Sequence, residues 1–208
     1  IKSSAASDVY KRQSKYFPWS KYISGKQGRS PGYDPLKIMV DVAHKNGMKI
    51  EAWVNPYRVT IGSTNYSKLS KNNPARKWHA KKSTSRNVLA YNGSLYYNPS
   101  KKDVRNLIIN GAKEIVKNYK VDGIHMDDYF YPEFTSKNVK TAFDAKEYNK
   151  SSYKKNKKSI YTYRRAQVST LVMDMKAAIK KINSKVTYGI SPAGNIDNLT
   201  SKYSYYVD

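Results

Sequence analysis

The chain has 208 residues, of which 39% are hydrophobic and 13% aromatic, enough for one domain with its own core. Its 39 Lys and Arg against 15 Asp and Glu give a net charge of +24, which favours polyanionic partners without distinguishing nucleic acid from anionic lipid or acidic cell-wall polymers. The lack of cysteine excludes disulfides and thiolate metal sites, and no apolar run approaches the roughly 18 residues of a membrane span.

The first regular elements are a helix and a strand in direct succession. A helix is predicted over 35–46, where Asp34 can cap the first turn, Pro35 suits the first helical position and Gly47 follows the end. A strand is predicted over 49–54, because β-branched and aromatic residues gather there.

Two stretches show no regular pattern. Residues 1–13 have no apolar period, so they are treated as a doubtful N-terminal segment that is not native to the domain. Residues 57–94 are rich in Lys, Ser and Asn and read as a long basic loop. Such a length is unusual in a compact domain, so the loop is either a binding loop or lid, or a solvated insertion.

The second half of the chain continues the alternation of helices and strands. Ser100 and Asp103 resemble a capping box before an amphipathic helix, which leads into a strand at 122–130. A third amphipathic helix is predicted within 162–185, followed by a strand at 186–192.

The polar stretches NPYR, DDYFYP and SPAGN each fall where a predicted strand ends. Alternating helices and strands predict an α/β fold with a parallel sheet, in which ligands bind at the carboxyl ends of the strands. The sequence therefore predicts one active site on that edge of the sheet.

Asp127 and Asp128 are the main catalytic candidates. In an extended strand, Gly123, His125, Asp127 and Tyr129 would share one face, so Asp127 is expected to point inward while Asp128 faces the loop or caps the following turn. A carboxylate here can act as nucleophile, as general acid or base, or as a metal ligand.

Other residues near the strand ends could bind substrate or serve the fold. Asn55, Tyr57 and Arg58 could bind sugar hydroxyls or form a hydrogen-bond network at the rim. His125 could tune the pKa of Asp127 or be a core histidine. Aromatic side chains that could stack on a sugar, or belong to the core, are Trp53, Tyr129, Phe130 and Tyr131. One of Arg164 and Arg165 could orient Asp127 or an acidic substituent.

Four motifs resemble the glycosyl-hydrolase-like family 10. They are AWVNPYRV at 52–59, the stretch from NPSKKDVRN to DGIHMDDYFYP at 98–132, YRRAQVSTLV at 163–172 and YGISPAGNIDN at 188–198. Their order and spacing match the family from about residue 15 to 208. The sequence departs from it at Glu51, where His is frequent, at Tyr163, where Trp is usual, and at Gln167 and Ser169, which replace amides.

The resemblance implies an incomplete TIM (β/α)8 barrel of the glycoside hydrolase type, with residues 14–208 as a partial domain truncated at both ends. It implies a glycosidase acting on the glycan of bacterial peptidoglycan or on a related polysaccharide, outside the cell or in its envelope, and no cofactor or metal. Asp127 is expected to be one of two catalytic carboxyl groups, with Asp128, Glu51, Glu133 or a residue of missing strands as the other. The expected substrate-binding residues are Trp53, Asn55, Tyr57, Arg58, His125, Tyr129, Arg165, Ser191 and Asn195.

Two other functions stay open at this point. The charge and the many tyrosines suit a polyanion or nucleic-acid-binding module, although no helix-turn-helix, RNP or zinc motif is present. A metal-dependent barrel enzyme would use Asp127 and Asp128 as ligands of a divalent cation. For the glycosidase, the positive surface would hold the protein near anionic cell-wall polymers.

Overall fold

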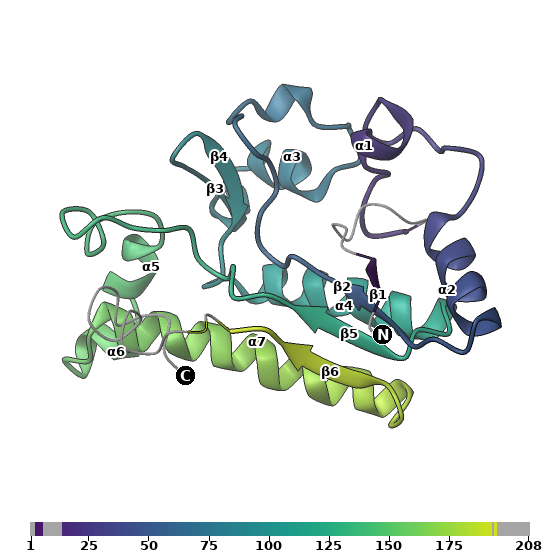
Figure 1. The fold of residues 1–208 in the computed structure, drawn as a ribbon. Coiled ribbons are helices and arrows are strands. Elements are labelled where there is room, and N and C mark those ends of the chain that lie inside the picture. Colours follow the sequence, from purple (N-terminus) through teal and green to yellow (C-terminus); the bar gives the residue numbers. More distant parts are fainter. Residues whose placement is uncertain (1–2, 6–13, 193, 195–208) are drawn as a thin grey trace.

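The computed structural model describes residues 14–192 and 194, together with the backbone of a short strand at residues 3–5. Its central sheet has four parallel strands in chain order (Figure 1): β1 (Ser3–Ala5), β2 (Ile50–Trp53), β5 (Gly123–Met126) and β6 (Thr187–Ile190). Parallel neighbours require crossover connections. These contain the helices α2 (Pro35–Lys45), α4 (Lys102–Asn118) and α7 (Ile160–Ile182). The predicted α/β class with parallel strands and flanking helices is confirmed, and the sheet is open.

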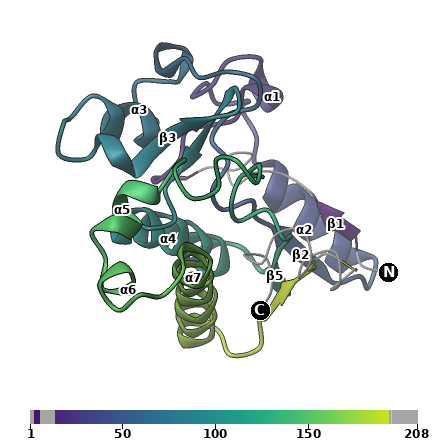
Figure 2. The same ribbon diagram turned by 90° about the vertical axis from the view of Figure 1, so that its left-hand side faces the viewer.

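The two faces of the sheet differ in chemistry. One face packs against apolar side chains of α4 and α7 in the main core. It carries every second residue of β2 and β5, namely Ile50, Ala52, Ile124 and Met126. The opposite, inner face carries Glu51, Trp53 and His125, which are only partly buried. Period-two alternation therefore places Glu51 and His125 on the face opposite to the one that packs on the helices. Figure 2 shows α4 and α7 together on one side of β5 and β6.

Local sequence explains where the long helices begin. Asp34 accepts a hydrogen bond from the backbone N–H of Lys37, and Pro35 occupies the first turn of α2, as predicted. Ser159 caps α7 in the same way by accepting from the N–H of Thr162. The capping box predicted at Ser100 is wrong. Helix α4 begins one residue later, after Lys101, because the Ser100 hydroxyl donates to Asp144 instead.

The loop after β2 contains more structure than its composition suggested. Between β2 and α4 lie α3 (Pro74–His79), two short 3-10 turns (Tyr66–Lys68 and Ser85–Asn87) and a hairpin of β3 (Val88–Tyr91) and β4 (Ser94–Tyr97). Asn92 and Gly93 both have positive φ and make the two-residue turn of that hairpin. The prediction of one long unstructured loop is therefore wrong.

Three strand-to-helix loops gather at the carboxyl end of the sheet. The first includes residues 14–34 with the short helix α1 (Lys21–Ser24), and the second is the segment just described. The third covers 127–159, with α5 (Ala145–Asn149) and α6 (Ser152–Lys155) and a small core of its own around Tyr131, Phe134 and Val139. The edge where polar residues were predicted is thus built from three loops (Figure 1).

Strand β1 lies inside the doubtful segment 1–13. It pairs in parallel with β2, Ser3 opposite Ile50 and Ala5 opposite Ala52. That this segment is not native stays a prediction. Among the described residues, no helix combines the length and apolar character needed to cross a membrane.

Candidate active site

Asp127 lies at the carboxyl edge of the sheet, one residue beyond the end of β5. The strand is shorter than predicted, so strict alternation ends at Met126, and a bend follows at Asp128. One carboxylate oxygen, Oδ1, accepts a hydrogen bond from the backbone N–H of Tyr129 at 3.0 Å. This bond fixes the carboxylate against the start of the third loop.

The surroundings of Asp127 disfavour its negative charge. Partial burial raises the pKa of its carboxyl group, and the neighbouring charge of Asp128 raises it further. The Tyr129 N–H and the cation of Arg58 act in the opposite direction, yet the pKa stays above its usual value. A carboxyl group with a raised pKa at a strand end is typical of acid–base chemistry.

Arg58 and Tyr129 lie beside Asp127 and connect the second loop with the third. The guanidinium of Arg58 stands over the ring of Tyr129, 5.7 Å from its centroid. The Tyr129 side chain is 53% exposed, so its ring offers an aromatic surface to solvent. Backbone pairing between Arg58 and Tyr96 holds the arginine against the β3–β4 hairpin.

Below the rim, polar side chains of three strands form a chain of contacts on the inner face. His125 Nε2 lies 2.8 Å from Ser191 Oγ, and His125 Nδ1 lies 3.2 Å from Glu51 Oε2. The Thr187 hydroxyl donates to Glu51 Oε1 at 3.0 Å. Because a carboxylate only accepts, a proton on Nδ1 would let His125 donate to Glu51, and Nε2 of that neutral ring would accept from Ser191. The contacts hold the His125 ring between Glu51 and Ser191 and favour this tautomer.

Two glycines leave the space that this network occupies. A Cβ added at Gly123 would lie 2.3 Å from Thr187 Oγ1 and 2.8 Å from Glu51 Cγ. One added at Gly189 would lie 3.1 Å from His125 Nδ1. Both glycines are next to these residues across the sheet, so side chains there would displace Glu51 or His125.

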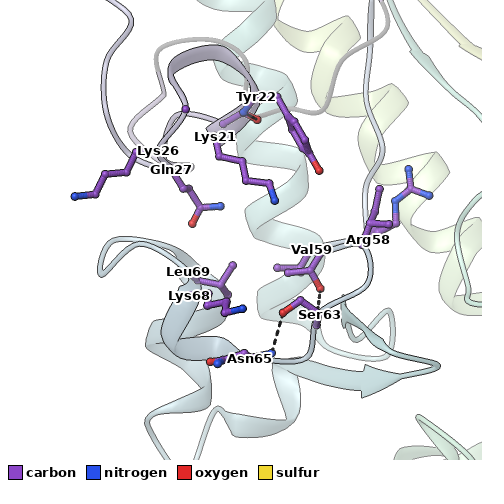
Figure 3. Close-up of a pocket in the computed structure, with 14 residues that line it drawn as sticks. Lys21, Tyr22, Lys26, Gln27, Arg58, Val59, Ser63, Asn65, Lys68 and Leu69 are labelled. Carbon is purple, nitrogen blue, oxygen red and sulfur yellow. Dashed lines mark hydrogen bonds between the residues drawn. The ribbon is translucent and has the colours of Figure 1, made fainter.

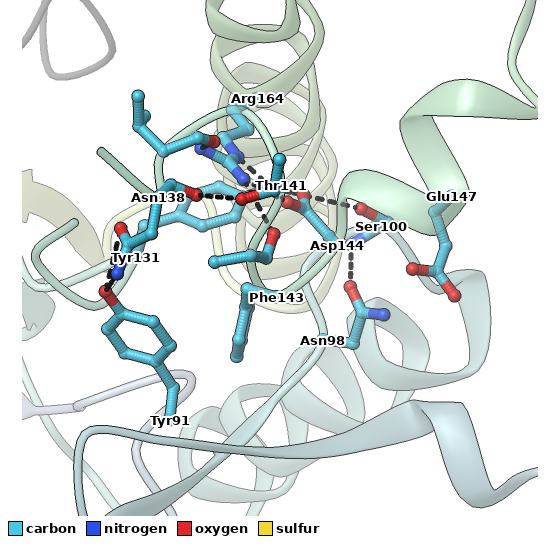
Figure 4. Close-up of polar contacts among 12 residues, drawn as sticks. Tyr91, Asn98, Ser100, Tyr131, Asn138, Thr141, Phe143, Asp144, Glu147 and Arg164 are labelled. Carbon is cyan, nitrogen blue, oxygen red and sulfur yellow. Dashed lines mark hydrogen bonds and ion pairs between the residues drawn. The ribbon is translucent and has the colours of Figure 1, made fainter. Parts of the chain in front are cut away.

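A buried ion pair supports the third loop from beneath (Figure 4). Arg164 of α7 and Asp144 are both completely buried, and Arg164 Nε and Nη2 lie 2.8 and 2.7 Å from Asp144 Oδ1. The other oxygen, Oδ2, accepts from the hydroxyls of Ser100 and Tyr131 at 3.0 and 2.9 Å. Every polar atom of this carboxylate is thus satisfied, as a buried charge requires.

Arg164 also clamps the loop directly. It donates to the backbone carbonyls of Val139 and Ala142, and its guanidinium lies 4.2 Å from the centroid of the Phe134 ring. Since Tyr131 follows Asp127 by four residues, the bond from its hydroxyl to Asp144 connects this buried network to the rim. A second ion pair between Arg86 and Glu147, at 2.6 Å, ties the same loop to the 3-10 turn before β3.

The predicted site residues do not all lie together. Trp53, His125 and Ser191 lie on the inner face or its rim, together with Asp127, Asp128, Arg58 and Tyr129. Asn55 and Tyr57, at the start of the second loop, are 3% and 1% exposed, and Asn55 Oδ1 accepts from the N–H of Arg58. Arg165 contacts Thr162 on its own helix at 3.4 Å. Asn195 lies outside the described residues.

Asp144, Ser100 and Thr187 are the supporting residues that sequence reasoning missed. Asp144 lies in a loop whose composition gives no periodic signal, and its partner Arg164 is 20 residues away. The arginine pair is visible in the sequence, but the expected partner was Asp127 or an acidic substituent, whereas Arg164 pairs with Asp144. Within residues 14–192, no group of three or more His, Asp or Glu side chains is arranged to hold a metal ion.

A parallel sheet with helices on one face and charged side chains at its carboxyl edge is the arrangement of enzymes built from βα units. The chain belongs to the glycosyl hydrolase-like 10 family, whose sequence model matches residues 3–208. The family expected from its motifs is therefore confirmed.

Two curated relatives and one solved structure illustrate the similarity. The chain is 40% identical to glycosyl hydrolase YngK of Bacillus subtilis (strain 168), over 87% of this chain and 34% of that protein. It is 36% identical to glycosyl hydrolase DigH of Escherichia coli (strain K12), over 87% of this chain and 40% of that protein. Alpha-L-fucosidase isoenzyme 2 from Paenibacillus thiaminolyticus shares the fold at 15% identity, with a TM-score of 0.51 over 87% of this chain and 25% of the other. The chain thus spans well under half the length of these relatives.

Proposed function

We propose that this chain is part of a TIM-barrel glycoside hydrolase that cleaves the glycan of bacterial peptidoglycan, with Asp127 as one catalytic carboxyl group. The observation that carries the proposal is the position of Asp127 at the carboxyl edge of the sheet, with a raised pKa, in a chain of a glycosyl hydrolase-like family. The four parallel strands would be consecutive strands of the barrel, and the inner face would line its interior.

Glycoside hydrolysis uses two carboxyl groups, one that protonates the leaving oxygen and one that attacks the sugar or activates water. Asp127 would be either the acid that protonates the leaving oxygen or the group that attacks the sugar or activates water. Asp128 is its immediate neighbour, while Glu51 is engaged with His125 and Thr187 below the rim. The exposed ring of Tyr129 would stack on a sugar, and Arg58 would hold it in place.

The net charge of +24 suits an exterior that stays close to anionic wall polymers, outside the cell or in its envelope. This attraction is long-ranged and unspecific, so it would raise the local concentration of enzyme without selecting a bond. In salt above the physiological range it should weaken, because screening shortens the reach of exposed charges.

The pH dependence of hydrolysis tests the role of Asp127. Asp128→Asn removes a negative charge that raises the pKa of Asp127, so the limb of the pH–rate profile governed by Asp127 should move to lower pH. A move of the acidic limb identifies Asp127 as base or nucleophile, and a move of the basic limb identifies it as acid. Asp174→Asn, an exposed change on α7, is the control and should leave both limbs in place.

The substrate class is tested with the protein encoded by the complete reading frame. Purified peptidoglycan glycan strands freed of their peptides, chitin oligomers and soluble starch are incubated with it, and new reducing ends are counted. We expect release from the peptidoglycan strands well above that from starch. Release from starch alone would contradict the proposal that peptidoglycan glycan is the substrate. Tight oligonucleotide binding at high salt, without turnover of any glycan, would contradict the proposal that the protein is a glycosidase.

A further inference from the structure

A pocket of about 320 Å³ lies between the first and second loops, next to the candidate active site (Figure 3). One wall is α1 with the turn that follows it, and the other is the segment from Arg58 to Leu69. Both loops follow strands at the carboxyl edge, so the pocket opens on the same rim as Asp127. Arg58 belongs to the pocket wall and also acts on the charge of Asp127.

The charges of the pocket are all of one sign. Its wall includes four cationic residues, Lys21, Lys26, Arg58 and Lys68, and no Asp or Glu among the described residues that line it. Figure 3 shows the Lys21 side chain extending from α1 into the space between the walls, with Lys68 on the opposite wall. The Lys26 and Arg58 side chains point away from this space in Figure 3, so Lys21 and Lys68 are the cations that face it. A bound anion would relieve the repulsion between these two like charges.

The two walls are held together by the protein itself. The Gln27 side-chain oxygen accepts from the Ser70 N–H at 2.8 Å and from the Asn73 amide at 3.2 Å. This arrangement leaves the Gln27 amide nitrogen on the side of Lys21 (Figure 3). On the far wall, the Thr60 hydroxyl donates to the carbonyl of Ser63 and accepts from the N–H of Leu95. The pocket is therefore formed before any ligand arrives, which lowers the cost of binding.

Apolar surface at the mouth of the pocket suits a sugar ring. Tyr22 and Ile61 are 65% and 68% exposed, so their apolar surface is accessible to a ligand. Both line the pocket, so a ring can lie on them while its charged substituent meets the cations.

We propose that this pocket binds an acidic group, a carboxylate or a phosphate, carried by a cell-wall saccharide beside the bond that is cut. The inference rests on the proposed function for the identity of the saccharide, but not for the binding itself. It makes Lys21 and Lys68 determinants of specificity for charged over neutral glycan.

Binding is measured by calorimetry with the Asp127→Asn form of the complete protein, so that no turnover interferes. The probes are an alternating N-acetylglucosamine and N-acetylmuramic acid tetrasaccharide, which carries carboxylates, a glycerol phosphate tetramer, and neutral chitotetraose. The test variant is Lys21→Gln with Lys68→Gln. The control is Lys45→Gln with Lys181→Gln, two exposed lysines near the ends of α2 and α7, away from the pocket lining.

We expect the test pair to weaken binding of an acidic probe roughly tenfold and to leave chitotetraose unchanged, while the control pair changes neither. The acidic probe that loses affinity identifies the source of the group. An equal loss of affinity for the acidic probes in the test and control variants, or no loss in the test variant, would contradict the proposal that this pocket binds an acidic group. If the wild-type protein hydrolysed no glycan while selective binding of the acidic probe persisted, the proposed function would be rejected and this inference would stand.

Discussion

Replacing Asp127 with Asn is expected to lower kcat for glycan hydrolysis roughly 10²- to 10⁴-fold, the usual contribution of a positioned acid or base. The amide keeps the size of the side chain and can still accept from the Tyr129 N–H, so the fold should not change. What is lost is the ability to carry a proton or a negative charge at the rim. The measurement is the rate of reducing-end release at saturating glycan.

Asp174→Asn is the matched control, because it removes the same charge from an exposed position on α7. It should retain the wild-type rate within a factor of about two, since surface changes are usually worth less than 0.5 kcal/mol. Undiminished hydrolysis by Asp127→Asn, in a protein that melts at the wild-type temperature, would remove Asp127 from the mechanism.

Replacing Arg164 with Ala should destabilise the protein by about 3–5 kcal/mol, the range found when one partner of a buried ion pair is removed. Asp144 would remain as a buried carboxylate with only the Ser100 and Tyr131 hydroxyls as partners. The loop carbonyls of Val139 and Ala142 would also lose their donor. Chemical denaturation of the complete protein measures the free energy of unfolding.

A second variant separates the charge from the packing. Arg164→Met combined with Asp144→Leu removes both charges together and should cost clearly less than the sum of the two single changes. Lys37→Ala, which breaks the exposed pair with Asp41, should leave the free energy of unfolding close to that of the wild type, because solvent screens a pair of exposed charges. If Arg164→Ala behaved like Lys37→Ala, the third loop would not depend on the buried pair.

Much of the fold could be predicted from the residues that begin and end helices and from the periodicity of apolar residues. Asp34, Pro35 and Gly47 locate α2 because a cap, a fixed φ and a left-handed residue act locally. The Asn92–Gly93 pair is a strong turn signal for the hairpin after β2, but the basic composition of 57–94 favours a loop over the strands beside it. The predicted strand at 122–130 is longer than β5, because alternation alone does not show where the pairing of strands stops.

The candidate site was predictable only in part. Period two correctly placed Glu51 and His125 on one face, because alternation along paired strands is a local rule. The contact of His125 with Ser191 depends on the register between β5 and β6, which one sequence does not state. The partnership of Asp144 with Arg164 depends on how an irregular loop folds over α7, and no sequence spacing encodes it.

The central claim is that water cleaves a glycosidic bond at the rim that carries Asp127. The most direct test is mass spectrometry of the products formed from a defined peptidoglycan glycan oligomer by the complete protein and by its Asp127→Asn form. We predict that the wild-type products come in pairs whose masses sum to that of the substrate plus one water molecule, and that these pairs are lost with Asp127→Asn. Products whose masses sum to that of the substrate alone, or an intact substrate after long incubation, would contradict the account.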